Sequence, residues 1–136
     1  MANIKWDKKN EASDRTKDKV INTMNNSCKM EIEAGFEFKI KGETYKFSYE
    51  QENQINLQNT DRLFELGIIE ETKWNAYLGE DKIRILLDKK TFSEVFLAGI
   101  MHKQSILSKY NDIILPSIDT MTNVEELKTL KWEDYK

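Results

Sequence analysis

This chain is poor in cysteine and histidine, two residue types on which many metal sites and nucleophilic active sites depend. It contains one cysteine and one histidine among 136 residues. A single thiol, Cys28, cannot form an internal disulfide, so nothing requires an oxidising compartment. A single imidazole, His102, has no second histidine or cysteine close in sequence, whereas zinc needs three or four converging ligands and a nucleophile pair needs a partner residue. Glycine-rich phosphate loops, CxxC pairs and HExxH are also absent. We therefore expect no metal, no cofactor and no catalytic residue, with His102 at the surface or at its boundary.

Long apolar runs and blocks of one charge are missing as well. The longest apolar run, around residues 113–115, is far shorter than a membrane span, and residues 1–10 lack the apolar core of a signal peptide. Basic residues (21) and acidic residues (24) are interspersed, with a formal net charge of -3. Such a surface offers no basic footprint for a polyanion. We expect synthesis in the cytoplasm and binding neither to membranes nor to nucleic acid.

The length and the polar beginning of the chain suggest its domain organisation. A chain of 136 residues fits one small domain with a modest core. Residues 1–13 are polar apart from Trp6 and are interpreted as an N-terminal arm. Such an arm is mobile unless a partner holds it, and Trp6 is a candidate anchor on a neighbouring subunit. Residues 14–136 are then one domain.

A helix followed by a hairpin is the clearest local pattern. Apolar residues recur at helical spacing over residues 12–34, with Cys28 on the buried stripe, and Gly35 suits the left-handed residue that ends a helix. Residues 36–40 and 45–49 alternate between apolar and polar side chains around a turn at Lys41, Gly42 and Glu43. Period-two alternation predicts two half-buried strands.

A second helix is predicted from a capping box at Ser48–Gln51 to Leu66. The apolar residues near its end are expected to pack inward: Leu63, Phe64 and Leu66. Its first half is crowded with amide side chains, including Gln54 and Asn56. These amides either form a solvated face or bond the hairpin backbone or a partner, because an amide both donates and accepts hydrogen bonds.

Residues 68–87 predict a second hairpin, with apolar alternation before and after a turn at Gly79. Arg84 alternates with the isoleucines and is expected to point to water or to an acidic neighbour. Carboxylates such as Glu71 and Asp81 raise the alternative of a small cell-wall hydrolase. Glycoside hydrolysis needs two carboxyl groups facing one cleft. Acids in a turn or next to each other on a strand do not share a cleft, so we expect solvated acids and no enzyme.

The remaining chain predicts a long helix and a short C-terminal helix. Residues 88–91 offer caps, and an apolar stripe over residues 92–114 permits either self-pairing or packing on the hairpins, although Lys103 interrupts it. Pro116 should kink or end this helix. A capping box at Thr122–Glu125 opens the short helix. Trp132 and Tyr135 are the aromatic residues near the end of the chain. They either pin the terminus to the core or contact a partner, and pinning is favoured more for Trp132 than for Tyr135.

Several of these segments, taken in order, resemble a known family. They are Ala34-Gly35-Phe36, Gly42-x-x-Tyr45, Gln51-x-x-Gln54-x-Asn56, Trp74 before the second hairpin, His102-Lys103, and Thr122-x-Val124-Glu125-Glu126-Leu127 with Trp132. Over residues 14–133 the chain is similar to an uncharacterised domain family of tailed-phage tail-fibre and baseplate-associated proteins.

The resemblance implies a structural role in a contractile tail or a phage-derived tailocin, in the baseplate or at the fibre attachment. The protein would be made in the host bacterial cytoplasm and act by packing against other tail, baseplate or fibre proteins. An assembly chaperone that leaves the finished particle is the alternative. The interaction candidates are Trp6, Gln54, Asn56, Trp132 and Tyr135.

The fold class expected overall is α+β, in the order helix, β-hairpin, helix, β-hairpin and long helix, with a short C-terminal helix.

Overall fold

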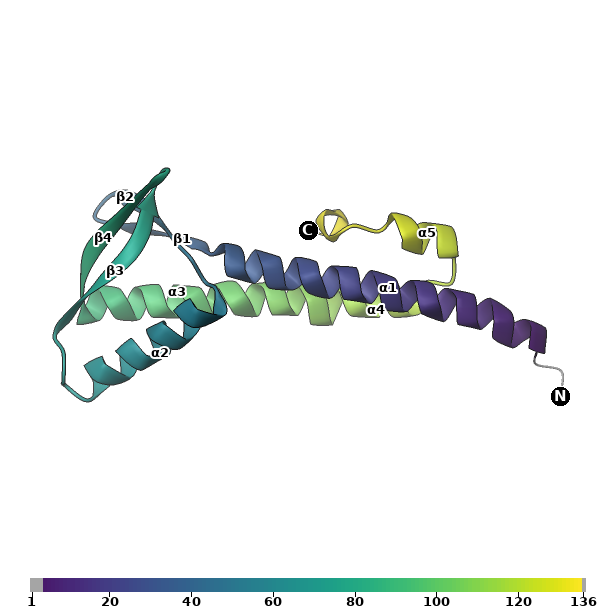
Figure 1. Ribbon diagram of the computed structural model, residues 1–136, viewed down its shortest axis with the longest axis horizontal. Coiled ribbons are helices and arrows are strands. Elements are labelled where there is room, and N and C mark those ends of the chain that lie inside the picture. Colours follow the sequence, from purple (N-terminus) through teal and green to yellow (C-terminus); the bar gives the residue numbers. More distant parts are fainter. Residues whose placement is uncertain (1–3, 136) are drawn as a thin grey trace. The chain divides into compact units, whose positions relative to one another are not determined.

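The computed structural model describes the backbone of residues 4–135 and the side chains of residues 13–135. Helices combine with a four-stranded antiparallel sheet in the predicted order of helix, hairpin, helix, hairpin, long helix and short C-terminal helix (Figure 1). The α+β fold class is therefore confirmed. Within it, contacts group the chain into two compact units, Glu31–Gln104 and the segments on either side of it.

The first helix begins earlier than its apolar stripe predicts. The sequence places its start near Ala12, but α1 spans Ile4–Ala34. Its end is as predicted: Gly35 has a φ of +95°, and its N–H donates to the carbonyl of Ile32 at 3.2 Å. A left-handed glycine of this kind terminates a helix because it lacks the side chain that penalises positive φ.

The two hairpins form one sheet with the strand order β1-β2-β3-β4. Strands β1 (Phe36–Ile40) and β2 (Glu43–Phe47) enclose a two-residue turn in which Lys41 and Gly42 both have positive φ, as a type I′ turn requires. Strands β3 (Glu71–Leu78) and β4 (Asp81–Asp88) pair along their whole length.

The hairpins are joined at a single aligned pair, Lys46 with Tyr77. The first five residues of β3, 71–75, are therefore paired with β4 on one side and with no strand of the described chain on the other.

Helix α2 (Gln51–Glu65) ends within one residue of its predicted end at Leu66, but it departs from the prediction in its N-cap and in the burial of its last residues. Its N-cap residue is Glu50, whose side chain makes no capping bond, so the capping box at Ser48–Gln51 was a wrong prediction. Near its C-terminus Phe64 is buried as expected. Leu63 and Leu66 are 38% and 55% exposed, so the prediction that both pack inward was wrong; neither lies on the helix face that carries the buried residues.

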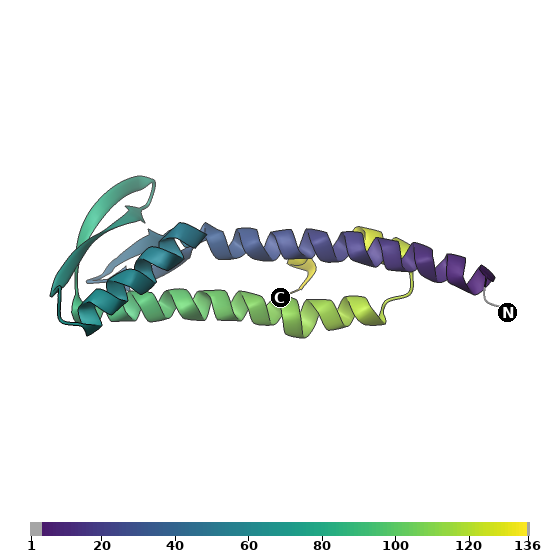
Figure 2. The ribbon, with the colours of Figure 1, turned by 60° about the horizontal axis from the view of Figure 1, so that its bottom comes forward.

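Helix α3 (Lys89–Ser108) begins where the sequence predicts. The Thr91 N–H donates to Asp88 Oδ1 at 2.8 Å, so Asp88 caps the helix. Figures 1 and 2 both show α2 alongside the first part of α3. Their contact includes Phe64 and Phe92, whose ring centroids are 5.1 Å apart. Aromatic pairs at this separation add to the free energy gained by burying their area.

The core of this unit comes from both helices and from the inner face of the sheet. Trp74 of β3 meets Phe92 edge-on at 5.9 Å, and Phe36 of β1 stacks on Phe47 of β2 at 5.6 Å. The buried apolar residues of this unit are Ile32, Phe36, Phe47, Tyr49, Leu57, Phe64, Ala76, Leu87, Phe92 and Val95.

The helical path does not end at Pro116. A π-helical segment, Lys109–Ile114, follows α3, and α4 (Leu115–Thr120) continues with Pro116 in its first turn. Proline is tolerated there because its missing N–H has no obligatory acceptor at a helix start. The wide turn before it removes the regular hydrogen-bond pattern that proline would break. The helical path therefore continues past Pro116 instead of ending there, and the helix type changes just before it.

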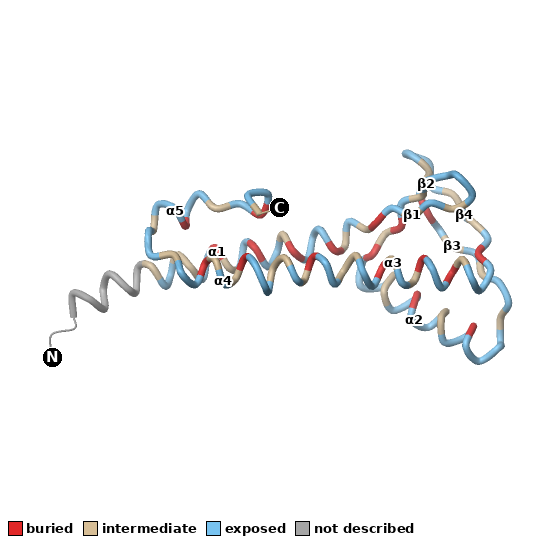
Figure 3. Tube along the Cα trace, turned by 180° about the vertical axis from the view of Figure 1, so that it is seen from behind, coloured by how far each residue is buried: buried red, intermediate tan, exposed pale blue. Residues whose placement is uncertain are grey.

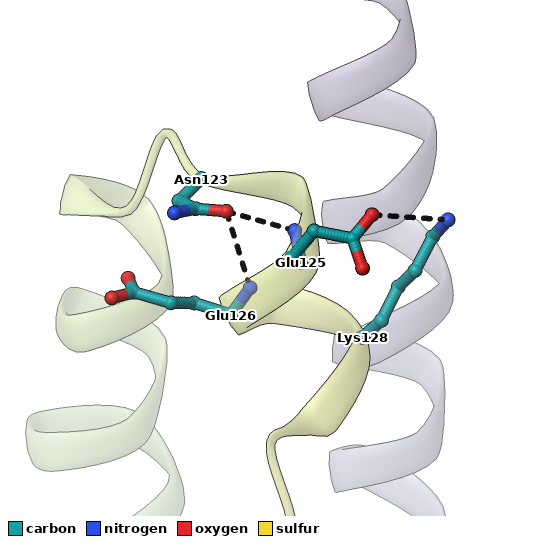
Figure 4. Close-up of polar contacts among 4 residues, drawn as sticks. All are labelled: Asn123, Glu125, Glu126 and Lys128. Carbon is teal, nitrogen blue, oxygen red and sulfur yellow. Dashed lines mark hydrogen bonds and ion pairs between the residues drawn. The ribbon is translucent and has the colours of Figure 1, made fainter.

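The C-terminal part of the second unit begins with α5 (Val124–Thr129) and closes with a 3₁₀ turn, Trp132–Asp134. Figure 4 shows the cap of α5: Asn123 Oδ1 accepts from the N–H of Glu125 at 2.9 Å and of Glu126 at 3.3 Å. The capping box predicted at Thr122 is therefore wrong by one residue. An asparagine oxygen reaches the same free N–H groups as a threonine hydroxyl would.

Buried positions of this unit recur along its helices, as the red bands of Figure 3 show. They are Val20, Met24, Cys28, Ile106, Ile114, Ile118, Leu127 and Trp132. Cys28 is 3% exposed, the packed thiol that its place on the apolar stripe predicts. None of the helices within the described residues combines the length and apolar character needed to cross a lipid bilayer.

Candidate functional site

The two aromatic residues near the C-terminus contact their own chain. Trp132 is 7% exposed, and Lys109 Nζ lies 4.3 Å from the centre of its ring, a cation–π arrangement. The Tyr135 hydroxyl is 2.9 Å from Ser117 Oγ. Both residues therefore pin the terminus, which the sequence favoured for Trp132 more than for Tyr135. A role for either in contacting a partner stays a prediction.

Gln54 uses both ends of its amide inside the protein. Its Nε2 donates to the carbonyl of Tyr49 at 2.9 Å, and its Oε1 accepts from Lys103 Nζ at 2.9 Å. One of the two alternatives from the sequence was that such an amide bonds the hairpin backbone or a partner. Tyr49 lies two residues beyond the end of β2, so Gln54 bonds the backbone just after the hairpin and not the hairpin strands themselves. Lys103, the residue that interrupts the apolar stripe, is thus the hydrogen-bond donor to this amide. The side chain of Trp6 lies outside the described residues, and its role as an anchor stays a prediction.

Asn56, the remaining interaction candidate, lies in a groove between α2 and β3. We call it the amide groove. Its volume is about 300 Å³. It is lined by Asn53, Asn56, Asn59 and Thr60 of α2, by Lys73, Trp74 and Asn75 of β3, and by Arg84 of β4. Residues three, four and seven apart share one helix face, which is why the asparagines and Thr60 converge on it.

The β3 wall of the amide groove is the part of that strand without a second strand partner. Leu78 and Asp81 flank a two-residue turn, so they form the hydrogen-bonded pair that closes such a hairpin. Hydrogen bonding then alternates along β3, and the backbone groups of residues between the bonded ones point away from β4. By this alternation, the N–H and C=O groups of Lys73 and Asn75 point away from β4.

The charges that line the amide groove are all positive. Lys73 and Arg84 contribute a cation each, and none of the lining residues is an acid. Arg84 Nη1 donates to Asn75 Oδ1 at 3.0 Å. The sequence predicted that Arg84 points to water or to an acidic neighbour. Arg84 is exposed to water, and its hydrogen-bond partner is an amide and not an acid. This bond holds the guanidinium group at the rim of the groove.

A second surface feature is apolar. Leu97, Ile100 and Met101 of α3 are 55%, 38% and 62% exposed. Their spacing of three and four residues places them on one side of the helix, and we call this group the α3 apolar face. The buried residues Phe92 and Val95 face the core from the other side of α3. Ile100 belongs to the apolar stripe predicted over residues 92–114, and it is exposed instead of packing on the hairpins.

The carboxylates considered for hydrolysis do not converge. Glu71 and Asp81 lie at opposite ends of the second hairpin, because Glu71 is opposite Asp88 and Leu78 is opposite Asp81. That separation is seven residues of strand (78 − 71), or on the order of 20 Å, whereas paired glycosidase carboxyls are roughly 5 to 9.5 Å apart.

A separate cavity of about 370 Å³ does bring several acids near one another: Glu43, Glu71 and Asp88. Their side chains are exposed. A backbone hydrogen bond from Thr91 lowers the pKa of Asp88, which is the opposite of what a general acid needs. No group of three or more metal-binding side chains occurs within residues 13–135.

His102 occupies a structural position. Its Nε2 is 3.0 Å from the carbonyl oxygen of Ile32, and its ring lies 5.7 Å from Phe36 and 5.9 Å from Tyr49. It is half-buried, as expected for a residue at the boundary between core and surface.

The amide groove was only partly visible in the sequence. The concentration of asparagine and glutamine in residues 51–59 was the available signal, and it gave Asn56. The contributions of Lys73, Asn75 and Arg84 depend on the position of β3 relative to α2, which no local pattern encodes.

Comparison of the chain with protein-family models, with characterised proteins and with solved structures found no match in any of the three.

Proposed function

We propose that this protein is a structural component of a contractile phage tail or a phage-derived tailocin. It acts in the baseplate or at the tail-fibre attachment, through packing against other proteins of the particle. The ordered motifs between Ala34 and Trp132 that resemble tail-associated proteins support this assignment.

The observation that carries the proposal is the α3 apolar face. Monomeric proteins expose single apolar residues freely, but grouped ones mark contact surfaces. Burying one such side chain fully is worth about 1.5–3 kcal/mol. Leu97, Ile100 and Met101 therefore provide a central apolar contact, and the α2–α3 core behind them holds it in a fixed shape.

The direct test compares purified intact particles with the lysate from which they came. Mass spectrometry should find this protein in the particles, at a constant ratio to the baseplate proteins. If the protein occurs in the lysate but is missing from intact particles, the structural role is wrong and an assembly chaperone is the better description.

Variants connect incorporation to the α3 apolar face. The double change Leu97→Glu with Met101→Glu should reduce incorporation at least tenfold, because a carboxylate in the centre of an apolar contact has to be desolvated. Met30→Glu is the matched control: it is 70% exposed on α1 and outside that face. Equal incorporation of the double variant and the control would contradict the proposal, provided that both have the wild-type circular dichroism spectrum.

A further inference from the structure

The amide groove offers hydrogen-bonding groups along both of its walls. On one wall, Lys73 and Asn75 present backbone groups that have no strand beside them. On the other wall, the side-chain amides of Asn53, Asn56 and Asn59 make no hydrogen bond within residues 13–135. An amide can donate to a peptide carbonyl and accept from a peptide N–H at once. The two walls therefore match the alternating groups of an extended backbone.

The dimensions of the groove fit a short extended segment. From Asn53 to Thr60, α2 rises about 10 Å at 1.5 Å per residue. The open part of β3, residues 71–75, spans about 13 Å at 3.3 Å per residue. Four residues of an added strand cover this length. Strand addition at an exposed sheet edge takes its affinity from such main-chain hydrogen bonds and its specificity from alternate side chains.

The charges of the groove select the chemistry of that segment. Lys73 and Arg84 line it, and no acid does. Opposite charge directs association and suppresses wrong partners. A nucleic acid fits less well, because two lining cations make a small phosphate footprint and the unpaired strand edge would have no backbone partner.

We propose that the amide groove binds an extended, acidic peptide segment of a partner protein, which adds to β3 as a further strand. This inference is independent of the tail assignment, because it depends only on the groove and not on the particle in which the protein works. Particle analysis and peptide binding can therefore fail separately.

The test uses the full chain and a displayed library of random twelve-residue linear peptides. Selected peptides should be enriched in acidic and β-branched residues. Methylating the backbone nitrogens on one edge of a selected peptide should reduce binding at least tenfold, because it removes strand hydrogen bonds and leaves the charges in place. Amide hydrogen exchange of Lys73 and Asn75 should slow when the peptide is bound.

Matched variants locate the binding. Lys73→Glu should weaken it at least tenfold, whereas Lys82→Glu, on the same hairpin but outside the groove, should change it less than threefold. Asn56→Ala with Asn59→Ala should weaken it, and Gln58→Ala on the same helix should not. All these positions are exposed, so thermal unfolding should stay close to wild type.

Several results would overturn the inference. One is that no peptide is enriched. Another is that the enriched peptides lack acids or bind the Lys73→Glu and Lys82→Glu variants equally well. A third is that a twelve-nucleotide single-stranded oligothymidine binds in a Lys73-dependent manner while the peptides do not, which would assign the groove to nucleic acid.

Discussion

At the scale of single residues, two glycines show how the same backbone angle has different consequences. Gly35 and Gly42 have φ values of +95° and +86°. A Cβ at Gly35 would clash with the Phe47 carbonyl oxygen, whereas a Cβ at Gly42 would meet nothing within 4 Å. The sequence predicts a left-handed glycine at position 35, but not that β2 passes directly against it. That requirement comes from the pairing of Phe36 with Phe47.

We therefore expect Gly35→Ala to cost at least ~3 kcal/mol of unfolding free energy, because backbone strain of about 1–3 kcal/mol adds to a clash with main-chain atoms. Gly42→Ala, the matched control, should cost about 1 kcal/mol from the φ angle alone. Urea denaturation of both variants measures the difference. Similar losses of unfolding free energy in the Gly35→Ala and Gly42→Ala variants would show that the backbone near Gly35 moves aside to admit the Cβ without an energetic cost.

Asp88 gives a prediction about pH. Its pKa is lowered, first by the backbone hydrogen bond from Thr91 and then by the hydrogen bond to the Thr91 side chain. A folded pKa below the unfolded value gives stability that is present above the unfolded pKa of about 4 and is lost as pH falls through the folded value. Asp88→Asn keeps a capping oxygen without a charge. The variant should lose less melting temperature than wild type between pH 5 and pH 3, and an unchanged acid dependence would contradict this.

At the scale of elements, the sequence located helices and strands better than their ends. Period-two alternation placed β1 at its observed bounds, Phe36–Ile40. Caps were less certain because Ser, Thr, Asn and Asp all serve as caps, and neighbouring candidates compete. Asn123 rather than Thr122 caps α5. Burial at helix ends was also overestimated at Leu66, because apolar residues there signal a helix without fixing which side faces the core.

The cap assignment is testable with neighbouring residues. Asn123→Ala should lower the unfolding free energy by about 1 kcal/mol, since it leaves the N–H groups of Glu125 and Glu126 without their acceptor. Thr122→Ala should have an effect within about 0.5 kcal/mol, as for a surface substitution away from such features. Chemical denaturation separates the two, and the reverse order would restore the threonine cap.

At the scale of the whole molecule, the order of the elements was predictable and the division into two units was not. Each pattern along the sequence is local, whereas the units bring together residues far apart in the chain. Lys17 Nζ donates to the Asp119 carbonyl oxygen at 3.0 Å, and Tyr135 reaches Ser117. Nothing in the spacing of these residues announces such contacts. For the same reason the amide wall of the groove was visible in the sequence and the β3 wall was not.

The pinned C-terminus should matter for the stability of its own unit. Trp132→Ala should cost about 3–5 kcal/mol, the range for removing a large buried aromatic side chain. Trp132→Phe should cost less, because most of the buried area remains. Hydrogen exchange followed by mass spectrometry should show faster amide exchange of the Trp132→Ala variant in α5 and in the segments packed with it. If Trp132→Ala leaves exchange there unchanged, the terminus is not held by this side chain.

The single bridge between Lys46 and Tyr77 also has a kinetic consequence. Since the start of β3 has no second strand beside it, no existing strand pairing has to break before the proposed peptide strand pairs with β3. Association of the peptide with the groove should then be limited by their relative orientation and not by a conformational change of the protein. The expected association rate constant is about 10⁵–10⁷ M⁻¹s⁻¹. Peptides that bind the amide groove more tightly should differ almost entirely in their dissociation rate constant.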